Sequence, residues 1–178
     1  YYLTFQLNVY FIGAVGRARL KDAQVEALEE ALKERVSGVT QEINKAIDAA
    51  EALFKDNQIE SVAEYSVPPM TVEVSVTSSL VSRYLELIHK LDRIMPLLDT
   101  LELHEVITPK QQNREKRRLR RETRACASQA RKIALAIRNR AIEGPQRPAG
   151  RPGETAGDHR SAQPDEERDD QATARAPR

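Results

Sequence analysis

Two short segments alternate strictly between hydrophobic and polar residues. In residues 3–11 one side carries Leu3, Phe5, Leu7, Val9 and Phe11, and in residues 71–77 one side carries Val72, Val74 and Val76. A period of two residues is typical of a half-buried β-strand, so we expect strands at both places. Gly13 and Gly16 follow the first segment and are expected to form a turn, because the spacing lacks the third glycine of a dinucleotide-binding loop.

Three longer segments repeat hydrophobic residues at steps of three and four, the spacing of one face of an α-helix. The first runs from Asp22, a suitable N-cap, to about Phe54, the second covers about 79–103, and the third covers 109–143. The first two faces consist of Val25, Leu28, Leu32, Val36, Val39, Ile43, Ala46, Ala50 and Leu53, and of Leu80, Tyr84, Leu87, Leu91, Ile94, Leu98 and Leu101. Each face can form the core of a helical bundle.

Capping residues and prolines set the ends of the second and third helices. Ser78 or Ser79 can cap the second helix, and Pro96 is expected to kink it because proline lacks an N–H. Thr108 can cap the third helix, with Pro109 as its first residue. These signals predict a mainly α protein with two short strands.

The composition changes sharply after residue 143. From residue 145 onward the chain has no Leu, Ile, Val, Phe, Tyr or Met and is rich in Pro, Gly, Arg, Asp and Glu. Such a segment buries too little apolar surface to offset the entropy of ordering it. We therefore expect one mainly helical domain over residues 1–143 and a disordered tail over 144–178.

Positive charge is concentrated in the third helix. Twelve of the 28 Lys and Arg residues lie between Lys110 and Arg140, where only Glu115 and Glu122 oppose them, so this window carries +10 within a chain of net charge +1. A basic stripe of this kind is typical of a surface that binds a polyanion, most often nucleic acid.

The cations gather on one side of the third helix. The predicted phosphate-binding residues are Lys110, Arg114, Arg117, Arg118, Arg121 and Arg124, and Glu115 and Glu122 are expected beside the apolar stripe. Alternatives are ion pairs with the acidic residues of the first helix (Glu26, Glu29, Glu30 and Glu34), an arginine-rich RNA-binding helix, or a membrane surface. The last is disfavoured because the apolar side is narrow and lacks Trp and Phe.

Other classes of function find little support in the sequence. A single cysteine, Cys126, cannot form an internal disulfide and fits a reducing, cytoplasmic compartment. Scattered His89, His104 and His159 do not make a zinc site with it. The sequence lacks a phosphate-binding loop and a Ser-His-Asp arrangement, and no run of about 20 apolar residues is present. We expect no enzyme activity, no cofactor, no metal, no small-molecule substrate and no membrane partner.

The order of strand, kinked helix and basic helix over residues 66–143 matches a ribbon-helix-helix unit. In such proteins two chains pair their strands into a ribbon that enters the major groove of DNA, so the arrangement predicts a homodimer or a higher oligomer. The outward residues of the strand would read base edges, and the basic helix would hold phosphates. The predicted base-reading residues are Thr71, Glu73, Ser75 and Thr77.

Several separated pieces of the sequence resemble the AcaB-like family of conjugative plasmids and integrative conjugative elements. These pieces are residues 3–7 leading to Gly16-Arg17, residues 66–74, the segment 84–92, and Val106-Ile107 followed by Arg117, Arg118 and Arg121. The resemblance implies a transcriptional regulator of transfer genes, similar to ribbon-helix-helix proteins and associated with bacterial DNA in the cytoplasm. A helical adaptor of the conjugation apparatus, binding other helices through the stripes at 25–53 and 80–101, is the alternative.

Overall fold

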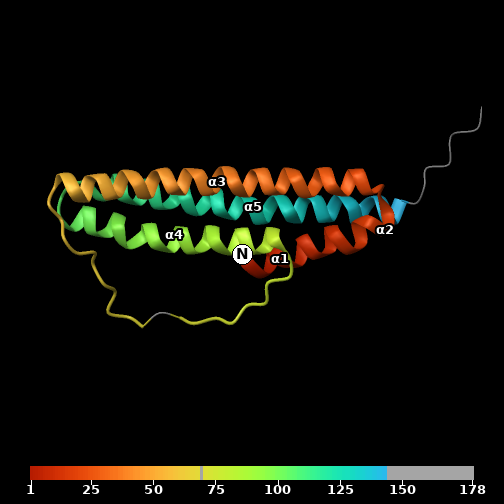
Figure 1. Ribbon diagram of the computed structural model, residues 1–178, viewed down its shortest axis with the longest axis horizontal. Coiled ribbons are helices and arrows are strands. Elements are labelled where there is room, and N and C mark those ends of the chain that lie inside the picture. The colour runs from red at the N-terminus through yellow and green to blue at the C-terminus, as the bar shows by residue number, and fades with distance from the viewer. Residues whose placement is uncertain (69, 144–178) are drawn as a thin grey trace, which may run out of the picture. The chain divides into compact units, whose positions relative to one another are not determined.

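A computed structural model describes residues 1–68 and 70–143, and within these ranges it contains helices and no β-strand. The elements are α1 (Tyr2–Phe11), the π-helix η1 (Ile12–Gly16), α2 (Arg17–Arg19), α3 (Asp22–Asp56), α4 (Ser79–Leu103) and α5 (Pro109–Glu143). Helices α3, α4 and α5 pack side by side, and α1 packs mainly on α5 and also on α4 (Figure 1). The predicted tail over 144–178 lies outside the described residues.

The three long helices agree with the pattern of hydrophobic residues. At the start of α4 the Ser78 hydroxyl accepts the Val81 N–H at 3.3 Å. At the start of α5 the Thr108 hydroxyl accepts the Gln111 N–H, and the Gln111 side chain accepts the Thr108 N–H at 2.8 Å, which is a reciprocal capping box. Pro96 lies inside α4, and the helix continues beyond it to Leu103.

The predicted strand at residues 3–11 is wrong, because this segment is the helix α1. Phe5, Val9 and Ile12 are buried at helical spacing, whereas Leu3 and Leu7 face solvent. The segment contains so many hydrophobic residues that both a two-residue and a 3.6-residue period can be read from it. Tertiary packing decides between them, since a helix satisfies its own backbone and the described chain offers no strand as a partner.

The predicted turn at Gly13 and Gly16 is also wrong. The helix continues as η1, and the chain reverses only at Leu20, which has extended backbone angles. A Cβ atom on Gly16 would lie 3.4 Å from Val25 Cγ2 and 3.7 Å from Ile137 Cδ1. These are ordinary van der Waals distances, so Gly16 lies where η1 packs against α3 and α5, and a small side chain would fit there.

The structure contradicts the ribbon-helix-helix fold, because residues 71–77 do not form a strand. They belong to the connector that joins α3 to α4, of which the structure describes residues 57–68 and 70–78. The connector is held by side chains: Ala63 N–H donates to the Thr100 hydroxyl at 2.8 Å, and the carbonyl of Ser75 accepts from Tyr2 Oη at 2.9 Å and Gln6 Nε2 at 2.8 Å. Alternating valines suit a strand, but a strand needs a neighbouring strand, and helix α1 occupies that side.

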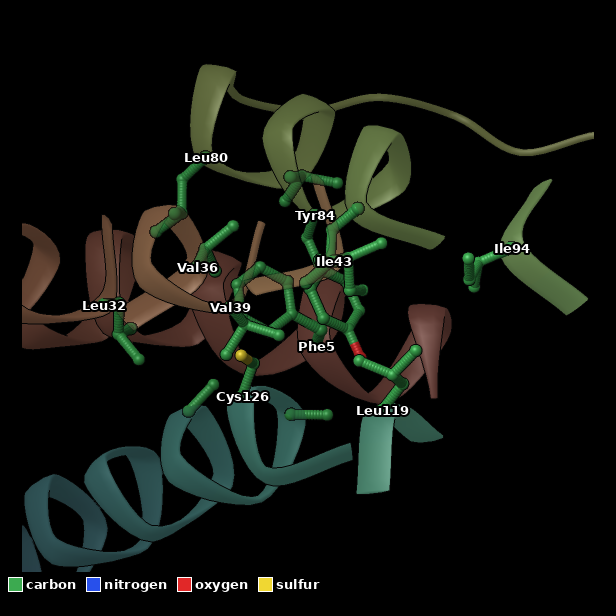
Figure 2. Close-up of a cluster of buried hydrophobic side chains, with 14 of the residues drawn as sticks. Phe5, Leu32, Val36, Val39, Ile43, Leu80, Tyr84, Ile94, Leu119 and Cys126 are labelled. Atoms are coloured by element: carbon green, nitrogen blue, oxygen red, sulfur yellow. The ribbon is translucent and has the colours of Figure 1, made fainter. Parts of the chain in front are cut away.

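The core is formed within one chain by α1, α3, α4 and α5. Its centre is the ring of Phe5, which stacks on Tyr84 with 4.0 Å between ring centroids (Figure 2). The Tyr84 hydroxyl donates to the Thr123 carbonyl at 3.1 Å, so the one polar atom of this buried ring is satisfied. The hydrophobic faces predicted for α3 and α4 are buried here, and these stripes are therefore not available to bind other helices as the adaptor hypothesis requires.

None of the helices in the described ranges is long and apolar enough to cross a bilayer.

Candidate nucleic-acid interface

The strongest concentration of cations in the structure lines an open groove of about 890 Å³ along α5. Its lining contains no carboxylate side chain and consists of Arg35, Arg117, Arg120, Arg121, Arg124, Ala125, Ser128, Gln129 and Lys132. Six cationic side chains with a hydroxyl and an amide between them are suited to an extended polyanion. A small neutral ligand would leave these charges without partners.

The groove follows the periodicity of α5. Arg117, Arg121, Arg124, Ser128 and Lys132 recur at steps of three and four, so they form one row that is about 22 Å long at 1.5 Å per residue. The opposite side of α5 is anchored in the core, where Leu119, Cys126 and Ala130 are buried. Burial of this apolar stripe fixes the rotation of the helix and leaves the cationic row exposed to solvent.

One wall of the groove comes from α3. Arg35 donates from Nη2 to Glu122 Oε2 at 2.7 Å, and Arg121 Nε lies 3.8 Å from the other oxygen of the same carboxylate. From the sequence we expected Glu122 to lie beside the apolar stripe of α5. In the structure its carboxylate instead accepts a hydrogen bond from Arg35, which lines the groove. The pair brings a cation from a second helix to the groove and compensates Arg35.

Arg118 differs from the other predicted phosphate-binding residues. It is half-buried outside the groove lining and donates two hydrogen bonds to Glu115, at 2.9 and 2.6 Å, while Glu42 of α3 lies 3.7 Å away. The hydrogen bonding of Arg118 to the Glu115 carboxylate is the main reason that the pKa of Arg118 is raised. Its charge is already compensated, so we assign it a structural role.

Five of the six predicted residues keep exposed side chains. Arg117, Arg121 and Arg124 lie in the groove, and Lys110 and Arg114 are exposed nearer the start of α5. The guanidinium of Arg124 lies 4.6 Å from the centroid of the Tyr1 ring. Among the side chains of residues 1–68 and 70–140, no carboxylate lies within 4 Å of the cationic groups of Lys110, Arg114, Arg117 and Arg124.

The four acidic residues of α3 that were considered as partners of the basic face, Glu26, Glu29, Glu30 and Glu34, are engaged elsewhere or stay apart from it. Glu29 lies 3.8 Å from Arg17, and Glu30 binds Lys33 at 3.0 Å. In the described part of the chain, neither Glu26 nor Glu34 forms an ion pair with α5. Apart from Arg118, which pairs with Glu115 and Glu42, the predicted basic face is thus an open surface.

The predicted base-reading residues do not lie on a strand. Thr71, Glu73, Ser75 and Thr77 are exposed on the connector, and none of them lines the cationic groove. Without a ribbon the geometric basis for base reading by these residues disappears.

Six groove residues lie outside the predicted phosphate-binding set: Arg35, Arg120, Ala125, Ser128, Gln129 and Lys132. Ser128 continues the row seven residues after Arg121, so the helical period could have found it. Arg35 could not have been found, because its place depends on how α3 packs against α5.

A second polar cluster holds the connector on α4 and α5. Asp99 Oδ2 accepts from Tyr65 Oη at 2.6 Å, and Oδ1 accepts from Gln112 Nε2 at 2.6 Å and from Lys116 Nζ. The pKa of the Asp99 carboxyl is lowered. Burial alone would raise it, but the hydrogen bonds from Lys116 and Tyr65 and the positive charge of Lys116 have the larger combined effect. Burial and Asp99 together raise the pKa of Tyr65 to about 12.

Replacing Asp99 with Asn should destabilise the protein by about 1–3 kcal/mol at pH 7, since Lys116 loses its counter-charge. The folded-state pKa of Asp99 is lowered, so this stabilisation is complete above the unfolded value of about 3.9 and is lost as the pH falls below it. Urea unfolding of both proteins between pH 7 and 3 should show the difference shrinking toward acid. Asp92→Asn, at an exposed site on the same helix, is the control. A constant difference at all pH values would contradict the assignment.

The single cysteine faces the core from α5 and is not part of the groove. Burial raises the pKa of the Cys126 thiol to about 11, which outweighs the opposing charge of Arg35. The thiol is therefore protonated at neutral pH, and thiolate chemistry is disfavoured.

The fold has a known counterpart. No family model matches the sequence, and a search of curated proteins finds no match. Among solved structures the chain is similar to AcaB from uropathogenic E. coli, with a TM-score of 0.73 and 25% sequence identity over 80% of this chain and 73% of that chain. The chain therefore has an AcaB-like fold, as its sequence pieces implied, and this fold is helical in the described residues without a ribbon-helix-helix core.

Proposed function

We propose that this protein binds double-stranded DNA through the cationic groove of α5 and regulates genes of a mobile element. The observation that carries the proposal is the exposed row of Arg117, Arg121, Arg124 and Lys132, joined by Arg35 from α3. Cations about 5–6 Å apart along one helix repel one another, and a phosphate backbone relieves this repulsion while releasing condensed counterions.

The AcaB-like fold supports the regulatory part of the proposal. The resemblance read from the sequence implies control of conjugative-transfer genes, and the structural similarity to AcaB agrees with that resemblance. Without a ribbon-helix-helix core, α5 provides the phosphate contacts in our proposal. Sequence discrimination then has to come from groups beside the row, of which Ser128 and Gln129 are polar and lie in the groove.

The salt dependence of binding tests the electrostatic part. Five groove cations remain when Arg35, which is bound to Glu122, is set aside, so the logarithm of the association constant should fall with the logarithm of salt concentration at a slope of roughly −4 to −5 per chain. Fluorescence anisotropy with a duplex of about 25 base pairs, between 50 and 300 mM salt, would measure this slope. A flat response would contradict binding through the groove.

Sequence selection tests the regulatory part. DNA that co-purifies with the protein should be enriched in particular promoter fragments, which should bind more tightly than shuffled duplexes of equal length. An RNA hairpin of equal charge serves as the second comparison. Equal affinity for the promoter fragments, the shuffled duplexes and the hairpin would mean that the protein binds nucleic acid only through its charge. Preference for the hairpin would favour an RNA-binding protein.

A further inference from the structure

The face of α1 that points away from the core is hydrophobic. Leu3, Leu7 and Tyr10 follow one another on this face with exposed fractions of 71%, 71% and 64%. No charged side chain occurs between residues 2 and 16. Single exposed hydrophobic residues are ordinary, but a row of three on an uncharged helix marks a surface that binds something.

The hydrophobic surface continues onto the elements on both sides of α1. On one side the connector is hydrogen-bonded to α1 through Ser75, and its Val72 and Val76 are exposed. On the other side lies a groove of about 470 Å³ between α1 and α5, whose apolar lining comprises Leu7, Phe11, Ala134 and Leu135. The surface thus spans three elements that are far apart in sequence.

The charges at the two edges of this surface have opposite signs. The only charged residues of the connector are acidic, and Glu73 is the one next to its contact with α1. The groove on the other side carries Arg131 and Arg138 from α5, and no carboxylate lines it. A two-fold axis parallel to α1 would bring the acidic edge of one chain onto the basic edge of a second chain.

We propose that this surface binds a second copy of the same chain, with α1 against α1 and Glu73 of one copy beside the α5 arginines of the other. Uncharged residues in the centre can be buried against themselves without leaving a charge unpaired. The attraction between the acidic edge of one copy and the basic edge of the other occurs twice in the dimer, because a two-fold axis repeats every contact. The exposed side chains are fewer than the 20–30 residues per side of a standard interface, so we expect a dissociation constant on the order of 1–10 μM.

Sedimentation equilibrium of the full chain between about 0.5 and 200 μM tests this proposal across the expected range. Wild type should dimerise, and Leu7→Glu should raise the dissociation constant at least about 100-fold, because two carboxylates would be buried. Leu103→Glu is the matched control, since Leu103 is equally exposed on α4 outside this surface. Thermal unfolding verifies that both variants fold. A monomeric wild type, or equal effects of the two substitutions, would overturn the proposal.

Charge reversal tests the orientation. Glu73→Arg and Arg131→Glu should each weaken the dimer about 10-fold, and the double variant should recover most of the loss, as double-mutant cycles at charged interfaces show. Additive losses would contradict the two-fold arrangement. Flotation with vesicles of about 30% anionic lipid gives a separate result: a chain that stays monomeric and binds vesicles has a membrane-binding α1, and the proposal fails. Leu7 lies outside the cationic row, so the Leu7→Glu variant can lose the dimer without losing DNA binding. The dimer proposal and the DNA-binding proposal can therefore fail separately.

Discussion

Replacing Arg117, Arg121 and Arg124 together with Gln lowers the affinity for duplex DNA by roughly 100- to 1000-fold at about 0.1 M salt. The expectation follows from about 0.9 logarithmic units per phosphate contact for each tenfold change in salt, so three lost contacts amount to about 2.7 units relative to 1 M salt. The three side chains are exposed in the groove, so glutamine should leave the fold intact. Anisotropy titrations at several salt concentrations should also show a slope smaller by about 2.7.

Two comparisons make this experiment specific. Lys45, Lys55 and Arg83 are exposed cations outside the groove lining, and changing all three to Gln removes the same net charge. This control should lower the affinity by less than about 10-fold, because distant charges are screened beyond roughly 10 Å. Arg118→Gln should likewise have a small effect, since Arg118 is bound to Glu115. Equal losses in both triple variants would mean that total charge, and not the groove, determines binding.

Phe5→Ala should destabilise the protein by about 3–5 kcal/mol, whereas Leu7→Ala should change the stability by less than about 0.5 kcal/mol. Phe5 is fully buried and stacks on Tyr84, and Leu7 faces solvent. The two residues would share one face of a strand, but they lie on different faces of α1. Urea denaturation at about 0.1 μM protein, roughly tenfold or more below the expected dissociation constant of the dimer, gives the two free energies of unfolding.

The comparison between the two variants separates the helix from the strand that the sequence suggested. In a half-buried strand both side chains would be truncated within the same core, and both variants would lose several kcal/mol. Similar large losses for Phe5→Ala and Leu7→Ala would therefore contradict the position of α1 in the structure.

The long helices could be predicted because several independent signals agree along each of them. In α5 the hydrophobic stripe, the N-cap Thr108 and the first-turn Pro109 all specify the same helix. The segments without such agreement were misassigned. Residues 3–11 satisfy two periodicities at once, and residues 71–77 have the alternation of a strand but no neighbouring strand in the described chain.

Those residues of the candidate site whose positions depend only on α5 could be predicted from the sequence. The exposed positions of Arg117, Arg121 and Arg124 follow from the period of α5 and its buried stripe. The contribution of Arg35 and the compensation of Arg118 by Glu42 depend on contacts between α3 and α5. Such contacts are set by tertiary packing, which no local pattern specifies.

The packing of α1 on α5 has a consequence for the synthesis of the chain on the ribosome. Phe5 and Val9 of α1 leave the ribosome before α4 and α5, whose surfaces cover them in the folded bundle. Helix α1 therefore keeps these apolar residues uncovered until α4 and α5 have been translated, and an apolar nascent segment of this kind is a target for chaperones.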